Sequence, residues 1–276
     1  VLAALIIVFR EVFEAGLIIG IVLAVTRSVP HRNLWIGGGV LAGVAGACLV
    51  AAFAGALSNL FAGMGQELFN AAILGIAVVM LTWHNVWMAR HGREMASEVR
   101  AIGQAVAEGS KSLFALAVVV GVAVLREGSE VALFLYGILT SDGGSALSLA
   151  LGGVIGLALG ALVCLLTYAG LISIPVRSLF AVTTVLITLL AAGMAAQAAA
   201  FLEKANWLTA MSNVVWDTSW LLEESSIPGK ALHTLVGYTD QPTAMQLVVY
   251  VAVLVITFVL MRFSASQPQA AQPARS

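Results

Sequence analysis

Two short stretches of this chain combine one arginine and two glutamates within otherwise apolar sequence. They are FREVFEAG at residues 9–16 and LREGSEVA at 125–132, and both read Arg-Glu-x-x-Glu. On a helix the two glutamates of each motif are three residues apart, so their carboxylates share one face. A charge at the centre of a bilayer costs roughly 2.5–3.5 kcal/mol on insertion scales, which makes such residues functional candidates. They are Arg10, Glu11, Glu14, Arg126, Glu127 and Glu130.

Paired carboxylates of this kind can hold a hard cation. Pairing each arginine with one glutamate leaves an uncompensated carboxylate in each motif, which a purely structural ion pair would not need. If the motifs meet, four glutamates and two arginines carry a net charge of −2, which a divalent cation neutralises. Carboxylate oxygens suit Fe(III), Mn, Mg or Ca. We expect Arg10 and Arg126 to keep the carboxylates ionised and to orient them. The residues alone predict transport of a hard cation whose identity stays open.

The composition places the chain in a membrane. Hydrophobic residues make up 61% of it and charged residues 10%, and the mean hydropathy is +1.01. A soluble domain is nearer half apolar and a quarter charged. We therefore expect an all-α integral membrane protein surrounded by lipid. The net charge of −1 gives no sign of a nucleic-acid partner.

Seven segments hold about 20 mainly apolar residues, the length that spans a bilayer. They run over 2–26, 34–58, 66–90, 113–140, 144–170, 177–202 and 244–263. We expect one transmembrane domain over 1–263, with a separate short polar helix at 92–112 and a long outer loop at 203–243. The tail at 264–276 has no periodicity and is predicted to be disordered.

Basic residues give the expected orientation, because lysine and arginine favour the cytoplasmic side. The connections after the first, third and fifth segments are basic, as is the tail, whereas the second connection has no basic residue. These residues are Arg27, Arg32, Arg90, Arg93, Arg100, Lys111, Arg177, Arg262 and Arg275. We predict a multi-pass protein of the cytoplasmic (inner) membrane, with the N-terminus outside and the C-terminus in the cytoplasm.

The sequence also repeats itself. The two charged motifs lie 116 residues apart, and GGVLAGVAGA at 38–47 matches GGVIGLALGA at 152–161 with an offset of 114. A looser match joins 68–81 to 179–192, offset by 111. Three segments therefore repeat in order, and because three is odd the second copy is inverted, as in many secondary transporters. Repeat one covers about 1–90 and repeat two about 113–202, and the seventh helix is an addition.

The paired motifs resemble those of a known family. Here they stand as REVFE and REGSE, and the form usual in high-affinity iron permeases is close to REGLE. The stretches FREVFEAGLIIGIVLA, LTWHNVWMARHGRE, WDTSWLLEES and GKALHTLVGY are also similar to bacterial members. Over nearly its whole length the chain resembles the oxidase-linked Ftr type and its bacterial EfeU-like relatives.

This resemblance implies an iron permease rather than an enzyme. Iron would be imported across the cytoplasmic membrane as the substrate, with no tightly bound cofactor. The resemblance also implies that the glutamates of the two motifs, Glu11, Glu14, Glu127 and Glu130, coordinate the metal. Fungal members work with a multicopper oxidase and bacterial ones with extracytoplasmic iron-binding or peroxidase-like proteins, so a partner of that kind is expected.

Other polar residues are candidates for lining the pathway of the cation. For each of them an ordinary structural role is the alternative. His84, within LTWHNVW of the third segment, is either a ligand or proton carrier, or a hydrogen-bonded packing residue. Glu67 is either an entry ligand or an interfacial residue. Gln197 either lines the pathway or packs. The acidic residues of the outer loop either collect cations or form a solvated surface; they are Asp217, Glu223 and Glu224.

Two alternatives remain at this point. Oxygen ligands discriminate weakly among hard cations, so the transported ion could be manganese, lead or another divalent metal. Four glutamates on facing helices are also similar to a membrane carboxylate di-iron oxidase. Di-iron bundles use Glu-x-x-His on two helices, and neither motif has a histidine at that spacing.

Overall fold

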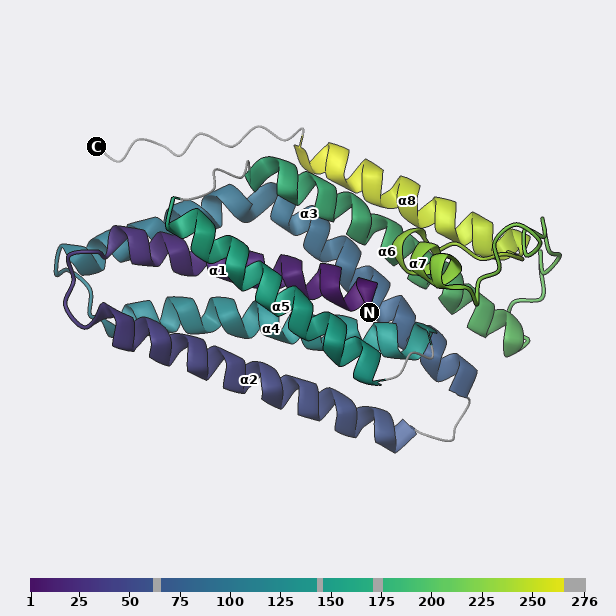
Figure 1. Ribbon diagram of the computed structural model, residues 1–276, viewed down its shortest axis with the longest axis horizontal. Coiled ribbons are helices and arrows are strands. Elements are labelled where there is room, and N and C mark those ends of the chain that lie inside the picture. Colours follow the sequence, from purple (N-terminus) through teal and green to yellow (C-terminus); the bar gives the residue numbers. More distant parts are fainter. Residues whose placement is uncertain (62–65, 143–145, 171–175, 266–276) are drawn as a thin grey trace.

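The computed structural model describes residues 1–61, 66–142, 146–170 and 176–265 (Figure 1). These residues form eight α-helices. They are α1 (Leu2–Val25), α2 (Arg32–Phe61), α3 (Gln66–Ala107), α4 (Phe114–Asp142), α5 (Ala146–Tyr168), α6 (Val176–Lys204), α7 (Ile227–Val236) and α8 (Ala244–Ala265). Of the tail predicted to be disordered at 264–276, the first two residues belong to α8, so the prediction is wrong for them. The rest of the tail lies outside the described residues.

Five helices contain stretches long and apolar enough to cross a membrane. These stretches belong to α2, α3, α5, α6 and α8. The helices α1 and α4 are of similar length, but each carries an arginine and two glutamates in its middle. The prediction of an all-helical integral membrane protein is therefore confirmed.

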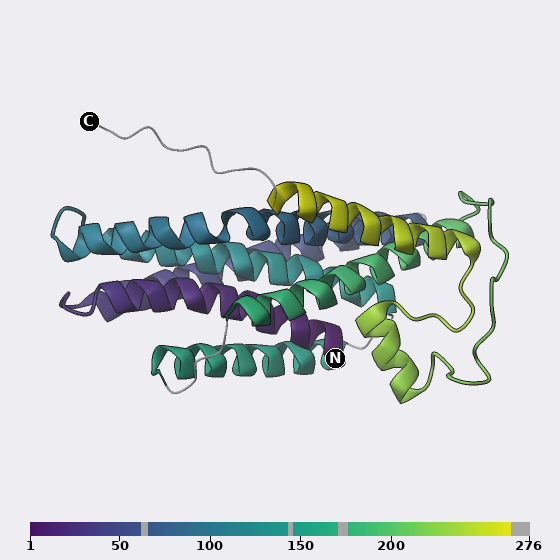
Figure 2. The ribbon, with the colours of Figure 1, turned by 90° about the horizontal axis from the view of Figure 1, so that it is seen from above.

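The helices pack so that the two charged motifs lie inside the bundle. Helix α2 lies along α4, α5 lies along α1, and α3 lies along α6. Helices α1 and α4 also contact each other and α3, while α8 covers α6 and α3 (Figures 1 and 2). The second helix of each proposed repeat thus covers the motif helix of the other.

Small residues at four-residue spacing let helix backbones approach closely. Helices α2 and α5 each carry such a series, Gly39, Gly43 and Ala47 in α2 and Gly152, Gly156 and Gly160 in α5. A Cβ atom at Gly39 of α2 would lie 2.5 Å from the Ala117 carbonyl oxygen of α4. A Cβ atom at Gly156 of α5 would lie 2.6 Å from the Leu5 carbonyl oxygen of α1. Only glycine permits backbones to approach this closely, so both motif helices are held tightly from outside.

Helix α3 is longer than the sequence predicts. The polar helix expected at 92–112 is present as far as Ala107, but it is not separate, because α3 continues unbroken from Gln66 to Ala107. Residues 89–107 are rich in alanine and arginine, which favour a helix, and the two glycines cost only about 1 kcal/mol each. Tertiary packing supports the extension, because Val99 and Val106 are buried and Gly103 faces Val25.

The segment expected as a long outer loop contains α7. Ser226 caps this helix by accepting a hydrogen bond from the Gly229 backbone amide, and Gly237 ends it with φ of 70°. Gly237 packs directly against Gly193, in the interior of α6. The segment therefore folds back against the bundle.

Two apolar clusters fill the bundle at different levels. The first includes Ile7 of α1, Leu81 of α3 and Phe134 of α4. The second includes Ile18 of α1 and Val120 of α4. On both motif helices the charged residues come between the two clusters, so the charged layer is enclosed by apolar layers on both sides.

Candidate metal centre

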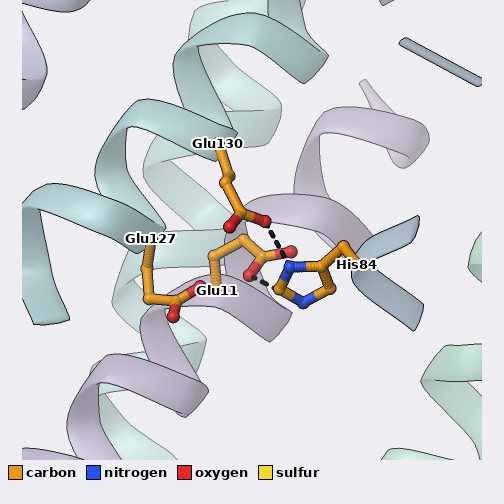
Figure 3. A group of neighbouring side chains, drawn as sticks. All are labelled: Glu11, His84, Glu127 and Glu130. Atoms are coloured by element: carbon orange, nitrogen blue, oxygen red, sulfur yellow. Dashed lines mark ion pairs between the residues drawn. The ribbon is translucent and has the colours of Figure 1, made fainter. Parts of the chain in front are cut away.

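Four side chains from three helices converge in the charged layer. Glu11 comes from α1, His84 from α3, and Glu127 and Glu130 from α4 (Figure 3). Each offers one ligand atom, and these atoms all lie within 4.8 Å of one another. Two ligands on opposite sides of a cation are about 4–5 Å apart when each bond is about 2.0–2.5 Å. The group has the dimensions of a site for one metal ion.

The His84 ring lies between the carboxylates of both motifs. Its Nδ1 atom forms an ion pair with Glu130 Oε2. Its Nε2 atom lies 3.5 Å from Glu14 Oε2 and 3.8 Å from Glu11 Oε2. The imidazole therefore adds a nitrogen ligand to the carboxylate oxygens of the site. Imidazole suits first-row metals such as iron.

The cluster is buried and short of hydrogen-bond partners. Glu11, His84 and Glu127 are at most 3% exposed. Among the described residues, both oxygens of Glu11 and one oxygen each of Glu14 and Glu127 lack a hydrogen-bond partner, and Glu130 Oε2 is paired with the His84 ring. Removing carboxylates from water without compensation is costly. A cation bound between them would supply that compensation.

Arg10 is fixed from two sides. Its Nε atom donates to Glu14 Oε1 at 2.9 Å, and its Nη1 atom donates to Asn85 Oδ1 at 2.8 Å. Asn85 Nδ2 in turn donates to Thr188 Oγ1 of α6 at 3.4 Å. The guanidinium is only 1% exposed. This network ties α1, α3 and α6 together and draws Glu14 toward Arg10.

Arg126 has a different environment although its motif is the same. Its Nε atom lies 3.2 Å from Glu130 Oε1 and 3.9 Å from Glu127 Oε1, both on its own helix. Its guanidinium carbon stands 4.0 Å from the centre of the Trp87 ring. The Arg126 side chain is 31% exposed. The two arginines are thus equivalent in sequence but not in structure.

The remaining candidate residues lie elsewhere. Glu67 is exposed at the start of α3, and Gln197 is half-buried in α6. Asp217 and Glu223 are exposed in the outer segment. Glu224 Oε1 lies 3.3 Å from His233 Nδ1. Hydrogen bonds from the Ser219 hydroxyl and backbone amide hold the pKa of Asp217 below its usual value.

Some residues around the centre are not singled out by the sequence. Asn85 is visible there only as a polar neighbour of His84, and Thr188 and Trp87 give no signal of their own. A polar residue within an apolar span indicates a functional role, and Asn85 is such a residue. Trp87 gives no such indication, because tryptophan near the end of a span usually marks the membrane interface.

The helical bundle encloses carboxylates and an imidazole within metal-ligand distance of one another. This arrangement is typical of membrane proteins that bind or transport cations. The model of the Iron permease FTR1 family matches residues 1–266. The chain belongs to this family, as its two motifs predict, and is a transporter rather than an enzyme.

Similar proteins include ferrous iron permeases named EfeU. The one from Escherichia coli O6:H1 (strain CFT073) is 31% identical over 92% of this chain and 94% of its own length. The one from Shigella sonnei is 30% identical over 90% of this chain and 91% of its own length. The one from Yersinia pestis is 28% identical over 92% of this chain and 90% of its own length. No solved structure matches the chain.

Proposed function

We propose that this protein imports iron across the cytoplasmic membrane through the cluster of Glu11, His84, Glu127 and Glu130. The observation that carries the proposal is the group of buried ligand atoms within 4.8 Å of one another. Nothing else among the described residues explains why three carboxylates and an imidazole should be enclosed together with so few hydrogen-bond partners.

Iron in the ferrous state fits this cluster. The similar proteins are named ferrous iron permeases. Counting the charges, Arg10 balances Glu14 and Arg126 balances Glu130, which leaves the two carboxylates of Glu11 and Glu127. A divalent cation neutralises these two charges. One imidazole among oxygen ligands also suits Fe(II) better than an ion such as Mg²⁺, which prefers oxygen alone.

Within the four-glutamate site that the motifs predict, Glu14 has a separate role. Its Oε1 atom accepts from Arg10, and its Oε2 atom faces His84 at 3.5 Å. We assign Glu14 to the edge of the site, where it orients Arg10 and His84. The metal is then held by Glu11, Glu127 and Glu130, with His84 as the fourth ligand.

The transmembrane arrangement we propose has seven spans, with α1 and α4 crossing the membrane among the other five. The distribution of arginine and lysine supports an outer N-terminus and a cytoplasmic C-terminus. The pairing of α2 with α4 and of α5 with α1 supports a three-plus-three inverted repeat, because exchanging the repeats exchanges these two pairs. In such proteins the substrate binds between the repeats.

An extracytoplasmic iron-binding protein or oxidase is the partner we propose at the outer side. The exposed acidic residues Asp217 and Glu223 support a role for the outer segment in attracting cations to this side. Removing both charges is expected to slow uptake at low iron concentration and to leave the maximal rate unchanged.

The test is radio-iron uptake by proteoliposomes that contain the purified chain. Iron is offered as Fe(II) and, separately, as Fe(III). We expect uptake of Fe(II) by the wild type and loss of uptake in Glu11→Gln and His84→Gln. The matched control is Glu98→Gln, which makes the same change at an exposed glutamate of α3. Normal uptake by Glu11→Gln would overturn the site, and uptake of manganese in preference to iron would overturn the substrate.

A further inference from the structure

A cavity reaches the metal centre from one side. It has a volume of about 320 Å³ and is lined by Met80, Trp83, His84, Trp87, Arg126 and Glu130. Two of these residues, His84 and Glu130, belong to the cluster itself. The cavity is therefore in direct contact with the proposed iron ligands.

The cavity lies where α3 changes from apolar to polar. The apolar stretch of α3 that could cross a membrane is Glu67–Met88, so Trp83 and Trp87 belong to its last two turns. Beyond it, Glu94, Glu98 and Arg100 are exposed. This change places the cavity beside the polar extension of α3, on the side that the basic residues assign to the cytoplasm.

Along the bundle axis, buried apolar side chains lie on both sides of the centre in the part of the chain that the structure describes. On α1 the charged residues come between buried Ile7 and buried Ile18, and on α4 they come between buried Val120 and buried Phe134. A cation cannot cross close-packed apolar side chains without a large desolvation cost. The cavity between α3 and α4 reaches the centre instead, and His84, Arg126 and Glu130 supply the polar part of its lining.

Arg126 is the positively charged side chain in the lining of this cavity, next to Glu130 of the cluster. Its hydrogen-bond partner Glu130 lies on its own helix, so that bond does not tie α4 to α3. Its contact with α3 is the Trp87 ring, 4.0 Å from the guanidinium carbon. Arg10, by contrast, is bonded to Asn85 of α3 and is almost fully buried. Arg126 is therefore the less restrained of the two arginines.

We infer that Trp87 is a positioning residue that holds Arg126 across the opening between the metal centre and the cavity, so that iron leaves the centre only when this contact breaks. The inference rests on the proposed function. A guanidinium in the opening repels a cation, and an aromatic ring under it lowers the energy of that closed position. Loss of the ring therefore favours the open arrangement.

The experiment measures the release of Fe(II) from the purified full chain under anaerobic conditions. The loaded protein is mixed with excess of a coloured ferrous chelator in a stopped-flow instrument. We expect Trp87→Leu to bind one Fe(II) as the wild type does but to release it about 2- to 30-fold faster, the range that loss of one cation–π contact permits. Trp87→Phe, which keeps a weaker ring, should be intermediate.

Two further variants separate this contact from general loosening of the cavity. Trp83→Leu removes a second indole from the same cavity wall, but Trp83 is 71% exposed on the outer face of α3. It should release iron at nearly the wild-type rate. In an Arg126→Gln background, Trp87→Leu should have no further effect, because its arginine partner is gone.

The outcomes are distinct. Equal release by Trp87→Leu and the wild type overturns the inference and leaves the proposed function standing. Equal acceleration by Trp87→Leu and Trp83→Leu also overturns it, because cavity size would then be the cause. If the folded wild-type chain binds no Fe(II), both the inference and the proposed metal centre are wrong.

Discussion

At the scale of single residues, two copies of one motif occupy two different environments. Arg10 is buried and tied to Asn85, whereas Arg126 is partly exposed and stacked on Trp87. The difference originates in α3. With the offset of 111 residues between the third segments of the two predicted repeats, His84 and Asn85 correspond to Ala195 and Ala196. Helix α3 therefore supplies polar side chains where the corresponding positions of α6 hold alanines, so the centre is asymmetric.

This asymmetry predicts unequal effects for Glu11 and Glu14. We expect Glu11→Gln to weaken Fe(II) binding more than about 100-fold, because it removes a direct ligand. Glu14→Gln should weaken it by only about 10- to 100-fold, the effect typical of residues that orient ligands. Titration calorimetry under anaerobic conditions measures both constants. Equal losses would instead support a site that uses all four glutamates.

The network around Arg10 predicts a stability effect. Asn85→Leu leaves the Arg10 Nη1 donor buried without its acceptor, and an unsatisfied buried donor costs about 1–3 kcal/mol. Thermal unfolding in detergent should show a melting temperature several degrees lower. Thr188→Val removes the 3.4 Å bond from Asn85 and the local 2.7 Å bond to the Thr184 carbonyl oxygen. Because Arg10 keeps its acceptor in this variant, the melting temperature should fall much less. A melting temperature unchanged by Asn85→Leu would contradict the role given to this network.

At the scale of helices, glycine positions decide which surfaces approach closely. In α2, Gly39 faces the backbone of α4, whereas a Cβ atom added at the neighbouring Gly38 would meet no other atom within 4 Å. Spacing in the sequence marks Gly39, Gly43 and Ala47 as one face, and this is the face that meets α4. The sequence thus predicted the packing face correctly, but it did not predict which helix would cover it.

The two neighbouring glycines allow a matched comparison. Gly39→Ala places a methyl group 2.5 Å from a backbone oxygen that cannot move independently. We expect it to destabilise the protein by about 1–3 kcal/mol. Gly38→Ala adds the same methyl group in open space and should be neutral or stabilising by up to about 1 kcal/mol through helix propensity. Thermal unfolding of both variants in the same detergent checks this, and equal stability would refute the close contact.

At the scale of the whole molecule, the sequence predicted the helices and the charged layer, but not the arrangement around it. Charges within apolar spans mark Glu11, Glu127 and Glu130 because only function justifies their cost. The position of His84 among them depends on how α3 packs against α1 and α4, which no local pattern encodes. The unbroken length of α3 was missed for the same reason, since contacts of Val99 and Gly103 with distant residues stabilise its polar half.

The orientation of the whole protein in the membrane can be tested by chemical labelling of its loops. We expect Ser225, exposed in the segment between α6 and α8, to face outward, and Ser110, exposed between α3 and α4, to face the cytoplasm. Single Ser225→Cys and Ser110→Cys variants are made in a background in which Cys48 and Cys164 are replaced. A membrane-impermeant maleimide should label the first in intact cells and the second only after permeabilisation.

This labelling also tests whether α4 crosses the membrane. The chain between Ser110 and Ser225 contains α4, α5 and α6. Three spans place the two serines on opposite sides, whereas α5 and α6 alone would place them on the same side. Labelling of both positions in intact cells, or of neither, would therefore show that α4 does not cross the membrane. The carboxylates of Glu127 and Glu130 would then no longer belong to a transmembrane pathway, and iron would need a route outside this cluster.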